Sequence, residues 1–169
     1  TTEMNKPLEY SYTTLEFEDI DIHLKTLKNK NQFSDDNHTA RDLGISSAQW
    51  SLFGVVWDSA MVLAYEMLEL EIQNKKILEV GCGIAVASHV LNARGADITA
   101  TDYHPEVERF LLKNTELNNQ KSIPFILENW NTDESNLQKF NLIIASDVLY
   151  ESEHIELLSR FLLSHSEEQ

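Results

Sequence analysis

The sequence predicts an α/β domain, a doubly wound and mostly parallel sheet, preceded by a β-hairpin extension. Apolar and polar residues alternate from Leu8 to Leu27, and this period of two residues is typical of β-strands. From residue 58 onward, short apolar runs alternate with stretches of helical spacing, a pattern typical of a parallel sheet covered by helices. The 169 residues, 42% of them hydrophobic, suffice for one hydrophobic core.

The N-terminal segment is expected to turn near Glu18 and Asp19, which separate its two alternating runs. The polar residues from Lys28 to Ser47 show no sustained period and predict a loop or a short ordered arm. We therefore expect two parts, a hairpin with its arm at residues 1–47 and the α/β domain at residues 48–169.

The α/β domain is predicted to begin with an amphipathic helix over residues 58–70, for which Asp58 or Ser59 is available as the N-cap. A strand of buried type, a glycine turn and a second helix follow, and Gly95 ends that helix. With the next strand they form a βαβ unit. Its strand, helix and strand are expected at 76–80, 84–93 and 97–101.

The alternation then continues to the end of the chain. Pro105 is well placed at the start of a helix that runs to about Leu117. Two more strands are expected at 124–127 and 140–146, and a last helix at 155–163. About four core strands are therefore predicted.

The composition is strongly acidic and narrows the classes of partner. Asp and Glu number 28 against 13 Lys and Arg, which gives a formal net charge of -15. Because binding of phosphates needs clustered basic residues, charge-driven binding to nucleic acid or to an anionic membrane is not expected. A basic partner is favoured instead. The single cysteine, Cys82, allows no internal disulfide, and no apolar run is long enough for a membrane span. A cytoplasmic protein is the simplest interpretation.

The main chemical motif lies where the first βαβ strand enters its helix. Gly81, Cys82 and Gly83 form a Gly-x-Gly turn, in which the backbone can approach a ligand at the N-terminus of a helix. A dinucleotide-binding motif would have a further glycine at position 86, which is Val86. A dehydrogenase is therefore disfavoured.

Two carboxylates flank this turn. Glu79 stands in an apolar strand and needs a partner, which is either a polar ligand with an ammonium group or Lys75 or Lys76 at the rim of the sheet. Asp102 follows the second strand at the spacing where nucleoside-binding βαβ units place a carboxylate against ribose hydroxyls. Alternatively, Asp102 helps to cap the next helix. His104 is expected to be a solvated residue near that cap.

Taken together, these motifs resemble the seven-strand, Rossmann-like S-adenosylmethionine-dependent methyltransferases. Within that superfamily, the sequences near Trp57, Asn129-Trp130 and Ser146-Asp147-Val148-Leu149-Tyr150 resemble the branch of protein-lysine methyltransferases with an Asp-x-x-Tyr motif. The resemblance covers roughly residues 50–163, and its motifs occur in the family's order. It implies S-adenosylmethionine as cofactor and a protein lysine as methyl acceptor, and the acidic composition is compatible with a Lys/Arg-rich protein partner.

The resemblance also implies roles for single residues. Asp147 and Tyr150 would stand beside the transferring methyl group, and Asp102 would hold the ribose. The other residues implied at the cofactor are Trp57, Glu79, Gly81, Cys82, Gly83, Tyr103, Trp130 and Ser146. Each has a structural alternative: the tryptophans as core aromatics, Tyr150 as a packing residue and Asp147 as a cap. No Cys or His cluster has metal-ligand spacing, so no metal is expected.

The chain departs from the family pattern in a few places. Ala85 replaces a usual glycine, which requires a negative φ at that position. Asn129 and Asn141 stand where acids are common, and the family fold continues through three more strands, so the sheet is expected to be incomplete at its C-terminal side. Two alternatives stay open: a small-molecule methyltransferase, and a catalytically impaired binding module that self-associates through an exposed sheet edge.

Overall fold

The computed structural model describes residues 8–30, 39–42, 50, 52–128, 139–148 and 153–167. Four parallel strands form its main sheet in the order β5-β4-β3-β6. From β3 the next strands in sequence, β4 and β5, are added on one side, and β6 is then added on the other side of β3. The predicted doubly wound α/β fold is therefore confirmed. The strands are β3 (Lys76–Val80), β4 (Asp97–Asp102), β5 (Phe125–Leu127) and β6 (Leu142–Ala145).

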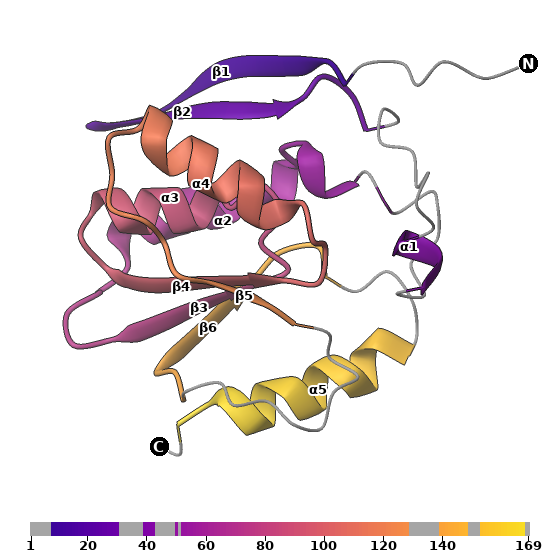
Figure 1. Ribbon diagram of the computed structural model, residues 1–169. Helices are drawn as coiled ribbons and strands as arrows, with labels where there is room; N and C mark the ends of the chain where they lie inside the picture. Colours follow the sequence, from indigo (N-terminus) through magenta and orange to yellow (C-terminus); the bar gives the residue numbers. More distant parts are fainter. Residues whose placement is uncertain are drawn as a thin grey trace, which may run out of the picture.

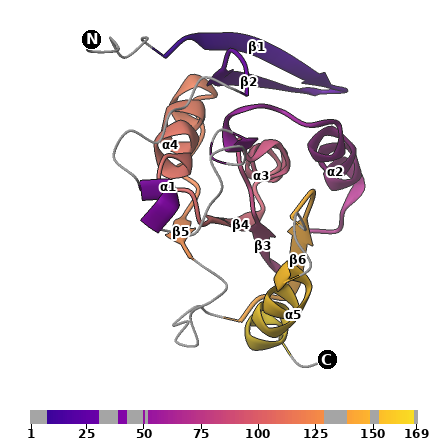
Figure 2. The same ribbon diagram turned by 90° about the vertical axis from the view of Figure 1, so that its right-hand side faces the viewer.

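Helices cover both faces of this sheet, and a hairpin covers the helices on one face (Figures 1 and 2). The helices α2 (Asp58–Glu69), α3 (Val86–Ala93) and α4 (Val107–Leu117) lie between the sheet and the hairpin, and α5 (Glu153–His165) lies on the opposite face. Successive residues of a strand face opposite sides, so Ile77 joins the core under α3 whereas Leu78 packs with Phe161 of α5.

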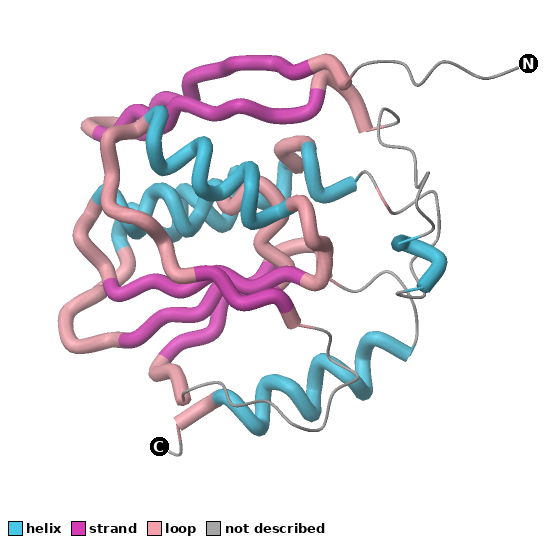
Figure 3. Tube along the Cα trace, viewed as in Figure 1, coloured by secondary structure: helices cyan, strands magenta, loops and turns pink. Residues whose placement is uncertain are grey.

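The N-terminal residues form the antiparallel hairpin that their alternation predicts (Figure 3). Its strands are β1 (Tyr10–Phe17) and β2 (Ile20–Leu27), and the turn lies at Glu18 and Asp19 as expected. Ile22 and Leu24 are buried in the main hydrophobic core while His23 between them is exposed.

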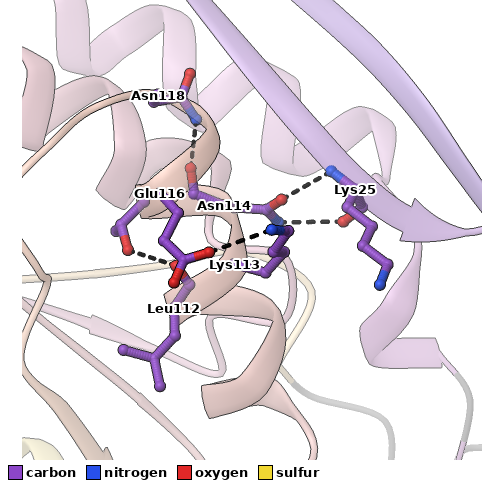
Figure 4. Close-up of polar contacts among 7 residues, drawn as sticks. Lys25, Leu112, Lys113, Asn114, Glu116 and Asn118 are labelled. Carbon is purple, nitrogen blue, oxygen red and sulfur yellow. Dashed lines mark hydrogen bonds and ion pairs between the residues drawn. The ribbon is translucent and has the colours of Figure 1, made fainter.

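Asn114 of α4 and Asn118 at the C-cap of the same helix hold the hairpin through the backbone of β2. Asn114 Oδ1 accepts from the Lys25 N–H at 2.7 Å, and its Nδ2 donates to the Lys25 carbonyl at 3.1 Å (Figure 4). One turn later, Asn118 makes the same pair of bonds to His23, at 2.7 and 2.8 Å. The side-chain amides thus replace a neighbouring strand and satisfy one edge of β2.

Replacing Asn114 by alanine is expected to lower the free energy of unfolding by about 2 to 3 kcal/mol, because a fully buried amide is lost and the Lys25 backbone groups lose their partners. Chemical denaturation checks this. Lys113→Ala is the control, since its exposed ion pair with Glu116 is worth less than about 1 kcal/mol. If both substitutions lower the free energy of unfolding equally, Asn114 does not hold the hairpin as described.

Several boundaries differ from the expectation. The N-cap of α2 is Trp57 and makes no side-chain cap bond, so the prediction of Asp58 or Ser59 as cap is wrong. Helix α3 begins at Val86 and not at residue 84, because Ala85 is still part of the turn. Gly95 ends α3 with φ +80°, as predicted. Two short elements, α1 (Thr39–Asp42) and the 3-10 turn η1 (Leu52–Gly54), precede α2.

None of the helices in the described ranges has the length and apolar character that crossing a membrane requires.

Candidate functional site

A pocket opens at the carboxyl ends of β3, β4 and β6. The turn after β3, the loop after β4 and the loop after β6 line it, together with η1 and the start of α2. Eight of the residues predicted from the sequence meet there: Trp57, Gly81, Cys82, Gly83, Asp102, Tyr103, Ser146 and Asp147. Trp130 and Tyr150 lie outside the described residues.

The turn after β3 has an unusual backbone. Gly81, Gly83 and Ala85 have φ values of +61°, +52° and +60°, and the Ala85 N–H donates to the Cys82 carbonyl at 2.6 Å. The prediction of a negative φ at Ala85 is therefore wrong, since the residue completes a tight turn before the helix starts. A Cβ at Gly81 would lie 2.6 Å from Val148 Cγ1, and one at Gly83 would lie 3.1 Å from the Phe53 carbonyl oxygen. A side chain at Gly81 would therefore clash with Val148, one at Gly83 would be crowded against Phe53, and both positive φ values favour glycine.

Asp102 fastens this turn to the end of β4. Its Oδ2 accepts from the Gly83 N–H at 2.9 Å, and its Oδ1 accepts from the His104 N–H at 2.9 Å. The carboxyl is buried and lines the pocket, and burial raises its pKa above the usual value. The alternative role in capping the next helix is wrong, because the N-cap of α4 is Glu106. Asp102 instead organises the pocket wall.

His104 also lines the pocket but is not solvated, so that prediction is wrong. Its ring packs against those of Trp50 and Phe53, with centroid distances of 4.0 and 3.9 Å, and its Nδ1 accepts from the Glu106 N–H at 3.1 Å. The burial comes from aromatic residues about fifty positions earlier in the chain, which local sequence around His104 does not reveal.

Glu79 lies behind the turn and does not line the pocket. On the face of β3 that α3 covers, its carboxylate accepts from the Ser88 N–H at 3.0 Å and from the Ser88 hydroxyl. The alternative that Glu79 pairs with Lys75 or Lys76 is therefore wrong. Sequence reasoning missed Ser88, although a serine in the first turn of a buried helix was a signal.

Burial raises the pKa of Glu79 from 4.5 to about 7, although the Ser88 bonds act in the opposite direction. Between these two pH values the folded protein holds a proton that the unfolded chain releases. The resulting stability is fully present below pH 4.5 and is lost as the pH rises through about 7.

Glu79→Gln removes this dependence. We expect the difference in free energy of unfolding between variant and parent to rise by about 3 kcal/mol from pH 4.5 to pH 8, in favour of the variant. Urea denaturation at several pH values checks this. His89, whose pKa burial lowers to about 4, titrates in both proteins and cancels in the comparison. If the free energies of unfolding of variant and parent change with pH in parallel, Glu79 does not titrate as described.

Asp147 stands on the opposite side of the pocket from Asp102's strand, in the loop after β6. It is exposed, has φ +48°, and its Oδ2 accepts from the hydroxyl of Ser59 in the first turn of α2. A left-handed aspartate is uncommon and marks a constrained position. The indole N–H of Trp57, at the N-cap of α2, donates to the Leu52 carbonyl at 3.0 Å. The start of α2 therefore joins two walls of the pocket.

The chain is similar in sequence to proteins of one known family. The family described as lysine methyltransferase matches residues 38–169. The chain is 31% identical to the protein N-lysine methyltransferase METTL21A of Danio rerio, covering 78% of this chain and 63% of that protein. For the METTL21A of Mus musculus, the identity is 33% and the coverage 70% and 57%. The chain thus spans less than two thirds of the length of these relatives.

A solved structure shares the fold. It is the T. thermophilus 16S rRNA N2 G1207 methyltransferase (RsmC) in complex with AdoMet and guanosine, with a TM-score of 0.66. The match covers 96% of this chain and 40% of that chain at 13% identity, which supports the fold alone.

Proposed function

Because the chain belongs to the lysine methyltransferase family, we propose that it binds S-adenosylmethionine and serves in methyl transfer to a lysine amine of a protein. The observation that carries the proposal is the convergence of Asp102, the Gly81–Gly83 turn and Asp147 in one pocket at the carboxyl ends of parallel strands. Open α/β sheets bind their ligands at this edge, where the strand order reverses.

The residues of the pocket fit this cofactor. Asp102 presents a buried carboxylate, and a carboxylate has about four acceptor sites, so it can accept ribose hydroxyls in addition to its backbone N–H donors. Gly81 and Gly83 carry no side chain between the backbone and the pocket. We assign cofactor binding to the eight residues Trp57, Gly81, Cys82, Gly83, Asp102, Tyr103, Trp130 and Ser146, with Trp130 assigned from the sequence alone.

In our proposal Glu79 supports the cofactor site from behind. Ser88 ties its carboxylate to the first turn of α3, and the glycine turn lies between these two residues. The pair thereby fixes where the turn leaves β3 and where α3 begins. Glu79 is thus a positioning residue for Gly81 and Gly83.

The cofactor, when bound, supplies a methyl group on a sulfonium sulfur. The neutral thioether that remains is an excellent leaving group. The protein must align a neutral amine with that methyl group and exclude water. Asp147 attracts and orients the incoming lysine ammonium, and Ser59 holds its carboxylate in place. Tyr150, assigned from the sequence alone, would close the channel. A proton leaves the amine before transfer, which desolvation promotes by lowering the amine's pKa.

The acidic chain suits a basic protein substrate, since the net charge is -15. A cytoplasmic location and self-association through the edge of β6, which pairs only with β3 among the described strands, stay predictions. Fractionation of cells and light scattering of the purified chain would test them.

Transfer of a labelled methyl group tests the proposed function. A cell extract is incubated with this chain and S-adenosylmethionine carrying a tritiated methyl group. The proteins are then precipitated away from the small molecules, and the protein fraction is hydrolysed and its amino acids separated. Label in methyl-lysine supports the proposal. Label confined to small molecules favours the small-molecule alternative, and cofactor binding without label favours the impaired binding module.

A further inference from the structure

We propose that the outer edge of β1 is a docking strand for an extended, lysine-rich segment of the protein substrate, an inference that rests on the proposed function. Such a segment would add a third strand to the hairpin. Main-chain hydrogen bonds would give affinity, and the acidic surface of the hairpin would select basic side chains.

The pairing pattern identifies which backbone groups face outward. Tyr12 is opposite Lys25 and Thr14 is opposite His23 in the register of the hairpin. The backbone groups of Lys25 and His23 bond to Asn114 and Asn118, so they point away from β1. In an antiparallel pair, opposite residues either bond each other or both point away. The N–H and C=O groups of Tyr12 and Thr14 therefore point to the outer edge of β1.

This edge is accessible. Residues 10–14 are all exposed, and the exposed fraction of the Tyr12 side chain reaches 64%. In the part of the chain that the structure describes, the hairpin sheet has two strands, and nothing pairs with β1 besides β2. The other edge of the hairpin is already occupied by α4. A third strand can therefore add only at β1.

The exposed end of β1 is connected to the pocket through aromatic packing. The Tyr10 ring lies 6.1 Å from that of Phe110, and Phe110 lies 5.5 Å from Phe53, between ring centroids. Phe53 lines the pocket. A segment on β1 would thus lie on the same packed unit as the cofactor site.

The charge of the hairpin favours a basic occupant. The Lys25 ammonium lies 3.8 Å from the centroid of the Tyr10 ring, and the Lys28 ammonium pairs with Glu9 at 2.7 Å. Both lysines between residues 8 and 28 are therefore engaged. The carboxylates of this segment outnumber them and are those of Glu9, Glu16, Glu18, Asp19 and Asp21.

Thr14→Pro tests the docking strand, because proline removes one outward N–H and keeps every charge of the protein. Thr14→Ala is the matched control, since it loses the same side-chain bond to His23 but keeps the N–H. The probe is a fluorescent eight-residue peptide of alternating lysine and valine, and binding is followed by anisotropy. We expect about tenfold weaker binding for the proline variant and parent-like binding for the alanine variant.

Equal binding by the proline and alanine variants would overturn the proposal, as would equal binding of a peptide of alternating glutamate and valine. If the proline variant does not fold, a lysine and valine peptide methylated on alternate backbone nitrogens replaces it, and this peptide should not bind the parent chain. S-adenosylhomocysteine binding is measured for each variant and is expected to be unchanged. If the parent chain does not bind S-adenosylhomocysteine, the result counts against the proposed function and not against peptide docking on β1.

Discussion

Replacing Asp102 by alanine is expected to weaken the binding of S-adenosylhomocysteine by at least about 100-fold, because hydrogen bonds to a charged group contribute about 1.5 to 3 kcal/mol each. The variant loses the acceptor assigned to the ribose. It also loses the bonds that hold Gly83 and His104 at the pocket. Calorimetric titration measures the change.

Asp97→Ala is the matched control, since Asp97 begins the same strand, is exposed at the opposite end of the sheet and carries the same charge. Its affinity for S-adenosylhomocysteine should stay within about twofold of the parent. An Asp102→Ala variant that stays folded and binds as well as Asp97→Ala would show that the cofactor site lies elsewhere.

Replacing Asp147 by asparagine is expected to lower the rate of methyl transfer to protein lysine by about 100-fold. Asparagine keeps the shape of the side chain, tolerates φ +48° and can still accept from Ser59, so the substitution removes chiefly the negative charge. Binding of S-adenosylhomocysteine should change by less than about threefold, because Asp147 acts on the acceptor amine.

For Asp147 the matched control is Asp58→Asn, which removes a charge from an exposed position beside Ser59. The rate is followed as tritium incorporated into methyl-lysine. If Asp147→Asn and Asp58→Asn proceed at the parent rate, Asp147 has no part in orienting the amine. If Asp147→Asn weakens cofactor binding as well as lowering the rate, Asp147 acts on the cofactor and not on the acceptor amine.

Much of the fold could be predicted because its elements leave local patterns. The alternation in the hairpin, the turn at Glu18 and Asp19, and the helix stop at Gly95 all follow from neighbouring residues. The meeting of Gly83 and Asp102 was also predictable, because adjacent parallel strands bring their carboxyl ends together.

The missed features depend on contacts between distant segments. His104 is buried by Trp50 and Phe53, which local pattern does not connect with it. Glu79 is satisfied by Ser88, because α3 folds back over the strand. Ala85 takes a left-handed backbone because the turn bonds to the Cys82 carbonyl before the helix starts.

Titration of S-adenosylhomocysteine into the parent chain tests the central claim most directly, since product binding needs no methyl acceptor. The arrangement of Asp102 and the Gly81–Gly83 turn predicts saturable binding at one site per chain. A chain that is folded by circular dichroism, and gives no binding signal at any concentration of S-adenosylhomocysteine tested, would contradict the assignment of this pocket.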